Sequence, residues 1–185
     1  MKKHVYINAP ITITFVVLCT IVTIIGMSIG DLLMQFFATY PSSPLNPMLY
    51  IRLFTHIFGH VDFNHLVSNM SYILLLGPIL EEKYHDRLIV IIVVVALVTG
   101  VIHNIIATDA LLGASGVVFA FILLSSITGK QKGIPLTLIL ITILYIGNEI
   151  ITGLTRADTI SHLTHIIGGI SGATMGLLFK DKENQ

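Results

Sequence analysis

Residues 165–176 read His-Ile-Ile-Gly-Gly-Ile-Ser-Gly-Ala-Thr-Met-Gly, and in this largely apolar run a glycine recurs at every fourth position from Gly168 to Gly176. Residues three or four apart share one face of an α-helix, so the run predicts a helix with one smooth stripe. Stripes of small residues let two helix backbones approach closely in a lipid bilayer. Gly116 and Ala120 form a second, shorter stripe earlier in the chain. The two stripes predict that their helices pack directly against each other.

The composition of the whole chain indicates a membrane protein. Of its 185 residues, 54% are hydrophobic and only 11% are charged, whereas a soluble domain carries about 25% charged residues. The formal net charge is zero, which argues against a nucleic-acid partner. The single cysteine excludes an intrachain disulfide and a cysteine-based zinc cluster. The lipid bilayer is therefore the expected surrounding of most of this chain.

Six apolar segments approach the length of about 20 residues that a spanning helix needs. They run over residues 11–29, 63–80, 88–107, 111–128, 134–153 and 161–179. The sequence predicts one domain over residues 1–185, an all-α polytopic membrane protein with six transmembrane helices. The stretch 30–62 is expected to be an external loop, with an interfacial helix that starts at Asp31 and is followed by turn-forming residues.

Lysine and arginine side chains indicate the orientation of the chain, because cytoplasmic loops carry an excess of them. With the N-terminus inside, eight of the ten fall on the cytoplasmic side, and only Arg52 and Arg156 fall outside. Both termini of this multi-pass protein of the cell membrane are therefore expected in the cytoplasm. The second, fourth and sixth segments then all enter the bilayer from the external side.

Strongly polar side chains inside spanning segments are energetically unfavourable, so they are candidates for function. In this chain they gather at three external helix mouths: His65 and Asn69 in the second segment, Ser115 in the fourth, and His162 and His165 in the sixth. At 1.5 Å per residue, these groups lie on the order of 5–10 Å below the same surface. The shared depth predicts one polar site that opens outward.

The residue types at this depth favour serine hydrolysis. Packing of the two small-residue stripes would bring Ser115 within reach of His165, as a nucleophile and its general base. His65 and Asn69 lie four residues apart on one helix face, and both side chains are able to donate hydrogen bonds to a developing oxyanion. The backbone N–H of Ser115 would add a third donor. The alternatives are stripes that serve packing alone, a serine bonded to its own backbone, and an asparagine that only joins helices.

Four strings follow one another along the chain: Arg-Leu-Phe-Thr-His-Ile-Phe-Gly-His at 52–60, His-Leu-Val-Ser-Asn at 65–69, Gly-Ala-Ser-Gly at 113–116 and His-Ile-Ile-Gly-Gly-Ile-Ser-Gly at 165–172. In this order, and over nearly the whole chain, they resemble the rhomboid family of intramembrane serine proteases. The resemblance implies a six-helix core and a Ser–His dyad without an acid, a cofactor or a metal. It implies these site residues: the nucleophile Ser115, the base His165, and the oxyanion or substrate-binding residues His65, Asn69 and Gly113.

Single positions add detail to this resemblance. Phe119 stands where many relatives have a tyrosine four residues after the serine, so a ring stacked on the histidine is expected without the hydroxyl. Ile51 stands in place of the tryptophan of a Trp-Arg pair in the external loop. Glu81 resembles the family's glutamate that braces the bundle on the cytoplasmic side.

Two histidines compete for the role of the base. The spacing favours His165 over His162, because glycines follow it at the third and seventh positions. No carboxylate is expected near them at the same depth. Glu149 is left with two interpretations, a protonated carboxyl bonded to a neighbour or a contact at a substrate gate. His103 and Asn104 are expected to cap a helix or to lie at the interface.

The sequence thus predicts an intramembrane serine endopeptidase that cleaves transmembrane segments of single-pass membrane proteins near the external side. The expected partners are these substrates and the bilayer. The main alternative is a metal transporter or metal-binding membrane protein, because His56 and His60 are four apart and Asp62, His65 and His165 are candidates to lie close. The absence of polar groups from the inner halves of the segments and of a His-Glu-x-x-His string argues against it. A third interpretation is a non-catalytic binder of transmembrane clients.

Overall fold

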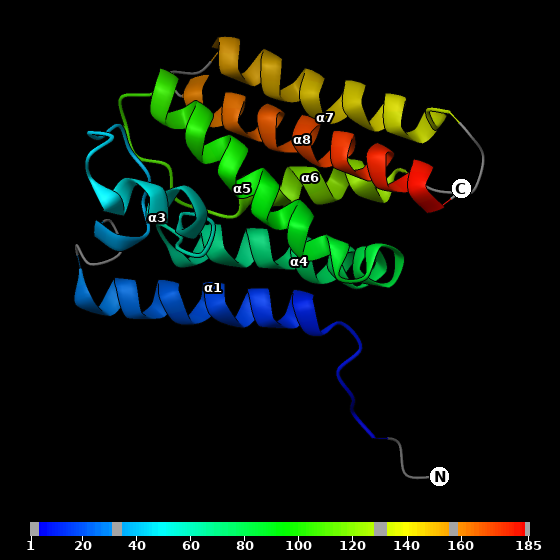
Figure 1. Ribbon diagram of the computed structural model, residues 1–185, viewed down its shortest axis with the longest axis horizontal. Coiled ribbons are helices and arrows are strands. Elements are labelled where there is room, and N and C mark those ends of the chain that lie inside the picture. The colour runs from blue at the N-terminus through cyan, green and yellow to red at the C-terminus, as the bar shows by residue number, and fades with distance from the viewer. Residues whose placement is uncertain (1–3, 31–34, 128–132, 156–158, 184–185) are drawn as a thin grey trace.

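The computed structural model describes residues 4–30, 35–127, 133–155 and 159–183, and these residues form a bundle of α-helices (Figure 1). The helices are α1 Pro10–Ile29, α3 Pro47–Thr55, α4 Phe63–Tyr84, α5 Arg87–Ile106, α6 Ser115–Ser125, α7 Leu136–Thr155 and α8 Thr159–Glu183. Within the described residues, extended structure is limited to one isolated antiparallel bridge between Thr39 and Leu111. The all-α class is confirmed.

The short helix α6 lies inside the bundle. Its residues are buried along almost the whole length, from Gly116 to Leu124, and they contribute much of the core. In Figure 1, α1 and α4 lie side by side below α6, while α8 and α7 lie above it. The start of α1 and the end of α8 lie at one end of the bundle, whereas α4, α6 and α8 all begin toward the other end. The external helix mouths named above therefore share one end.

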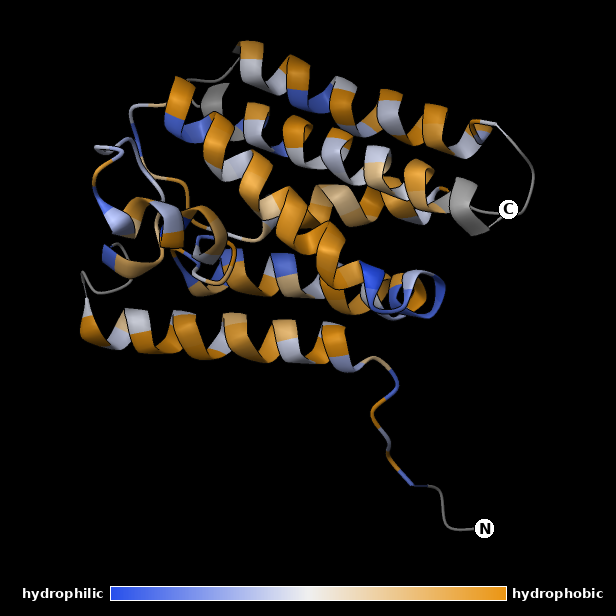
Figure 2. Ribbon diagram, in the orientation of Figure 1, coloured by the Kyte–Doolittle hydropathy of each residue, from blue (hydrophilic) through white to orange (hydrophobic). Residues whose placement is uncertain are grey.

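Four helices in the described part of the chain are long and apolar enough to cross a membrane, namely α1, α4, α5 and α7. Figure 2 shows hydrophobic residues over most of α1 and α5. Large apolar side chains on the outside of α1, such as Ile24 and Ile29, are 52% and 60% exposed. Such a surface is unfavourable in water and expected where lipid is the solvent.

The fourth apolar segment, predicted over residues 111–128, is wrong in its length. The helix α6 has 11 residues, about 17 Å at 1.5 Å per residue, against a hydrocarbon core of about 30 Å. The preceding backbone is used for tertiary hydrogen bonds instead. Leu111 exchanges bonds of 2.8 and 3.0 Å with Thr39, and the Gly113 N–H donates to the His56 carbonyl at 2.9 Å. These bonds keep the chain extended, so the helix begins only after them.

Each of the other five predicted segments begins and ends within about four residues of the corresponding helix. The last of them, predicted over residues 161–179, is α8 with 25 residues, and its composition is more polar than that of the four apolar helices. Glycine and polar residues along α8 are the reason, because they lower its hydropathy without shortening the helix.

The external loop contains a helix, α3, that the sequence reasoning missed. It begins at Pro47, directly after Asn46, whose side-chain oxygen accepts a hydrogen bond from the Met48 N–H at 3.0 Å. An asparagine cap followed by proline is a common helix start, so the signal was present among the turn-forming residues. The expected interfacial helix starts at Asp31, and residues 31–34 lie outside the described residues.

Arg52 anchors the external loop where a tryptophan is missing. Its side chain is 2% exposed, and the guanidinium carbon lies 4.0 Å from the centre of the Tyr40 ring. The guanidinium also donates to the Tyr40 hydroxyl and to Ser42 Oγ, the latter at 3.1 Å. A cation–π contact that is shielded from water is stronger than an exposed one. The buried guanidinium of Arg52 therefore joins α3 to Tyr40 and Ser42 of the same loop.

Glu81 joins α4 to the start of α1. Its carboxylate accepts hydrogen bonds from the Ile11 N–H at 2.8 Å, the Thr12 N–H at 2.9 Å and Thr12 Oγ1 at 2.8 Å. The first N–H groups of a helix have no partner within it, and the positive end of the helix dipole favours an anion there. The glutamate therefore braces the bundle, as expected from the sequence.

We expect Glu81→Ala to lower the free energy of unfolding by about 2–3 kcal/mol, because three hydrogen bonds to a charged group are lost and two backbone donors are left without a partner. The measurement is thermal unfolding in detergent micelles. Glu82→Ala is the matched control, since Glu82 is the next residue of α4 and is exposed. An equal loss of stability in both variants would contradict the brace.

The two small-residue stripes meet at the contact between α6 and α8, as predicted. A Cβ atom built on Gly168 would lie 2.7 Å from Gly116 Cα, and one built on Gly172 would lie 2.7 Å from Ala120 Cα. Both distances are far shorter than the contact of two carbon atoms at about 3.5–4.0 Å. Only glycine on α8 therefore permits this approach of the two backbones.

Candidate active site

A cavity of about 490 Å³ lies among α4, α6, α7 and α8, and the predicted site residues meet there. Ser115 enters it from the start of α6 and His165 from the second turn of α8. His65 and Asn69 line the same cavity from the first two turns of α4. Four side chains that are up to 100 residues apart in the sequence are thus brought to one place.

The loop before Ser115 is held by two histidines of the external loop. The Gly113 N–H donates to the His56 carbonyl, and the Ala114 N–H donates to His60 Nε2 at 3.3 Å. Burial lowers the pKa of His60 from 6.5 to about 4, and the nearby His65 acts in the same direction. The His60 ring is therefore neutral at pH 7 and accepts this hydrogen bond. The start of α6 is fixed in place by these contacts.

The His56 ring is the second neutral support of this region. Burial lowers its pKa from 6.5 to about 4, while the Arg52 carbonyl that its Nδ1 contacts at 3.2 Å raises it. Its other ring nitrogen lies 3.4 Å from Thr99 Oγ1 on α5. His56 thus ties the external loop to α5, directly beneath the backbone that leads to the serine.

The candidate oxyanion site combines the side chains of His65 and Asn69 on α4 with the backbone N–H groups that begin α6. The Gly113 N–H, which was predicted to take part, donates to the His56 carbonyl instead, so Gly113 serves the site only by leaving room for the His65 ring. The Asn69 Nδ2 atom is buried and has no hydrogen-bond partner among the described residues, so its protons are available to a ligand. Gly113 has φ = +142°, and a Cβ there would lie 2.6 Å from His65 Cε1. A glycine is required by both the backbone and the ring. Together with the free N–H groups at the start of α6, these donors surround the space beside Ser115.

The His165 ring is fixed by an aromatic neighbour. It stacks on Phe119 with 4.6 Å between ring centres and 9° between ring planes. The stacking expected from the sequence is confirmed. The ring of Tyr145 on α7 in turn packs edge to face against Phe119, with 6.1 Å between the two ring centres. The imidazole plane is therefore set by contacts from α6 and α7.

The expectation that no carboxylate lies near the two histidines is wrong. Glu149 Oε2 on α7 lies 3.0 Å from His165 Nδ1 and 2.5 Å from His162 Nδ1. Glu149 is 7% exposed. The sequence carried a signal for this contact, because Glu149 is one helical turn after Tyr145 and lies in an otherwise apolar helix. The depth of the fifth segment relative to the sixth was the missing information.

The same three residues are the candidate metal ligands among the described residues. One ligand atom from each of Glu149, His162 and His165 lies within 4.8 Å of the others. Hydrogen bonds between carboxylate and imidazole account for the two short distances without an ion. The predicted metal pair does not form such a group, because the His60 ring lies beside Thr23 and the His56 ring beside Thr99.

The side chains of His103 and Asn104 hold the end of α5 and the loop behind it. His103 Nε2 lies 3.1 Å from the Asp109 carbonyl oxygen. Asn104 Nδ2 donates to the Gly100 carbonyl at 2.8 Å and to Thr39 Oγ1 at 2.5 Å. Both residues therefore close the helix end, which agrees with the expected capping role.

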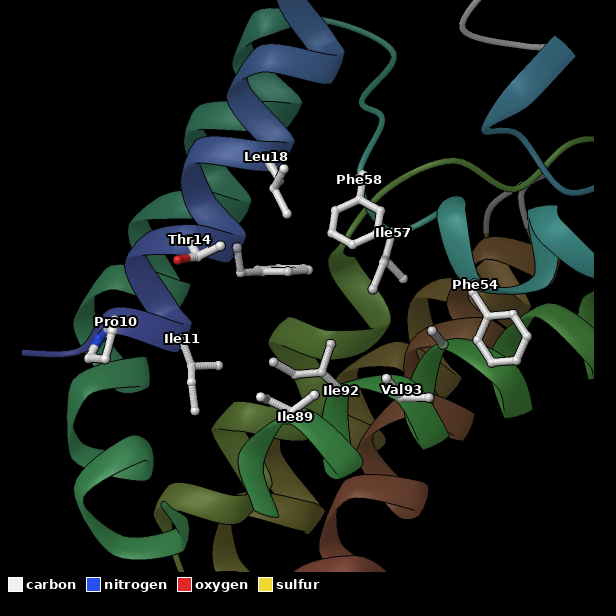
Figure 3. Close-up of a pocket in the computed structure, with 12 residues that line it drawn as sticks. Pro10, Ile11, Thr14, Leu18, Phe54, Ile57, Phe58, Ile89, Ile92 and Val93 are labelled. Carbon is white, nitrogen blue, oxygen red and sulfur yellow. The ribbon is translucent and has the colours of Figure 1, made fainter. Parts of the chain in front are cut away.

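A second cavity, of about 400 Å³, lies between α1, α5 and residues 54–58 (Figure 3). Its side chains are apolar except for the hydroxyl of Thr14. Apart from that hydroxyl, the side chains that line this cavity include no acid, base or nucleophile. This cavity therefore offers little chemistry, in contrast to the cavity that holds Ser115.

The chain is similar to known proteins over most of its length. The family model described as the Rhomboid domain matches residues 48–182. The chain is 32% identical, over 177 residues, to proteins named Rhomboid protease GlpG from Salmonella choleraesuis, Salmonella paratyphi A and Salmonella typhi. The aligned region covers 91% of this chain and 63% of each relative, so the chain spans less than two thirds of their length.

Proposed function

The chain belongs to the rhomboid family, and on this premise we propose that it is an intramembrane serine endopeptidase with Ser115 as its nucleophile and His165 as its general base. The observation that carries the proposal is the convergence of Ser115, His165, His65 and Asn69 on one cavity. A hydroxyl, an imidazole and unpaired hydrogen-bond donors in a shared space are the components of acyl transfer.

The reaction proceeds through an acyl-enzyme. Ser115 Oγ attacks the carbonyl carbon of a peptide bond while His165 takes the hydroxyl proton. His65, Asn69 and the backbone N–H groups at the start of α6 donate hydrogen bonds to the resulting oxyanion. The C–N bond then breaks as His165 returns the proton to the leaving amine. Water adds to the ester in the same manner, releases the carboxylic acid and restores the Ser115 hydroxyl.

We place the protein across the cell membrane with six spanning segments and both termini in the cytoplasm. The bias of lysine and arginine supports this orientation, and the start of α1 lies at the same end of the bundle as the end of α8. The whole of residues 1–185 would then form one membrane domain. The cavity would open to the external side, and the short α6 would begin below that surface, where water from outside reaches Ser115.

The substrates would be transmembrane segments of single-pass proteins, cut near the external side. A helical carbonyl is hydrogen-bonded within its own helix and shielded by side chains, so the segment must unwind locally before attack. A small residue at the cut and a helix-breaking residue nearby satisfy this requirement. The external loop, residues 30–62, and α7 border the lateral path from lipid to the cavity.

We expect a fluorophosphonate probe to form a covalent adduct on Ser115 in the detergent-solubilised protein, because an activated serine attacks phosphorus as it attacks a carbonyl. Mass spectrometry of the peptide that contains residues 113–116 locates the adduct. Ser115→Ala is the control and must remain unlabelled. An unlabelled Ser115, with proteolysis that a chelator abolishes and the probe does not, would favour a metal enzyme instead.

A further inference from the structure

We propose that Glu149 is a positioning residue for the reaction, which acts through the general base of the proposed Ser115–His165 pair. The inference rests on the proposed function, since it assigns a partner to the same general base. It is carried by one contact: Glu149 Oε2 lies 3.0 Å from His165 Nδ1, on the side of the ring away from the nitrogen that serves as base. Because the Glu149 carboxylate is buried and held at this distance, it remains beside the ring throughout the reaction.

The contact selects the tautomer that the chemistry requires. A carboxylate only accepts hydrogen bonds, so a neutral His165 must carry its proton on Nδ1. Nε2 is then left with a lone pair, and this is the atom that takes the proton from a serine in Ser–His–Asp enzymes. When Nε2 gains that proton, the ring becomes positive, and the adjacent carboxylate stabilises the charge in a site of low dielectric constant.

His162 completes the support of the carboxylate. Its Nδ1 lies 2.5 Å from the same Oε2 atom, and its ring is nearly perpendicular to that of His165, at 88° with 6.2 Å between centres. Two ring nitrogens, from residues three apart on α8, therefore contact the same carboxylate oxygen of Glu149 on α7. Gly153 permits this approach, since a Cβ there would lie 3.3 Å from His162 Cβ. The second histidine thus has a role that is distinct from that of the base.

The surroundings of His165 make Glu149 its one acidic neighbour in direct contact among the described residues. The other titratable groups that face the ring are His162 on α8, Tyr145 on α7 and His65 on α4. Farther across the cavity lie the side chains of His103 and Asp109. Glu149 therefore dominates the charge next to the imidazole, and its removal is not compensated by a second carboxylate.

The variant Glu149→Gln tests the proposal, because it keeps the size and removes the charge. We expect kcat to fall by roughly 10²–10⁴-fold with KM changed by less than about threefold, since the contribution arises only when the ring is positive. Glu149→Asp should recover part of kcat. Asn148→Ala is the matched control, being the exposed neighbour on α7, and should leave both quantities unchanged.

The outcomes separate this inference from the proposed function. A wild-type kcat in Glu149→Gln, while Ser115→Ala is inactive, overturns the role of Glu149 and leaves the protease intact. Activity in Ser115→Ala overturns the protease itself. Loss of wild-type activity on treatment with a chelator identifies the cluster as a metal site and also overturns the inference. If Glu149→Gln does not fold, the rate of fluorophosphonate labelling is measured on Glu149→Ala, where a wild-type rate counts against the proposal.

Discussion

Replacing Ser115 by alanine is expected to lower the rate of cleavage of a transmembrane substrate by at least about 10⁴-fold, because the proposed acyl-enzyme forms on its hydroxyl. The hydroxyl lies at the first residue of α6 and is not required to begin the helix, since the preceding turn is held by backbone bonds to the external loop. The unfolding temperature in detergent should therefore remain close to that of the wild type. The measurement is gel-based cleavage of a single-pass substrate in detergent and in liposomes.

Ser68→Ala is the matched control, since Ser68 lines the same cavity from α4. It should retain activity within about fivefold, a change typical of a side chain that contributes only weak contacts. His165→Ala should be as inactive as Ser115→Ala, and the double variant should be no worse than either, because the two groups act as one unit. Cleavage that persists in Ser115→Ala, or that survives in His165→Ala but disappears in His162→Ala, would refute the assignment.

Much of the helical framework was predictable from the sequence. Five of the six apolar segments correspond closely to helices, because hydropathy over about 20 residues is a strong signal in a membrane protein. The contact of Gly168 with Gly116 was predictable for the same kind of reason, since small residues at every fourth position have few other uses in lipid. The meeting of Ser115 with His165 in one cavity followed from that contact.

The remaining features depended on tertiary structure. Residues 111–114 are as apolar as a membrane-spanning helix, yet N–H and C=O groups among them form hydrogen bonds with Thr39 and His56. Hydropathy does not register such a competition, so α6 was expected to be too long. The contact of Glu149 with His165 was missed for a related reason, because composition does not give the relative depth of α7 and α8. A shift of one residue along a helix moves a side chain by about 1.5 Å, which is enough to make or break its bond to His165.

Gly168→Ala is expected to reduce both stability and activity, because it separates the two helices that carry the proposed nucleophile and base. The added methyl would overlap the Gly116 carbonyl oxygen and lie 2.7 Å from Gly116 Cα. Both are backbone atoms, which cannot rotate away as a side chain can. Overpacking of this kind costs about 1–3 kcal/mol. Displacement of the base from the nucleophile by about 1 Å costs roughly 10²-fold in rate.

A series along the same stripe distinguishes this mechanism from a general intolerance of alanine in α8. Gly172→Ala should behave like Gly168→Ala, since its Cβ would lie 2.7 Å from the backbone at Ala120. Gly176→Ala should lose less than the other two, because its Cβ would meet only the ends of side chains: Leu124 Cδ2, which is the nearest, Ile127 Cδ1 at 2.9 Å and the Tyr84 hydroxyl at 3.0 Å. Unfolding temperature and the rate of fluorophosphonate labelling are measured for all three. Equal losses of stability at the three positions would contradict the argument, since a Cβ at Gly168 or Gly172 meets backbone atoms of α6 and a Cβ at Gly176 meets side-chain ends.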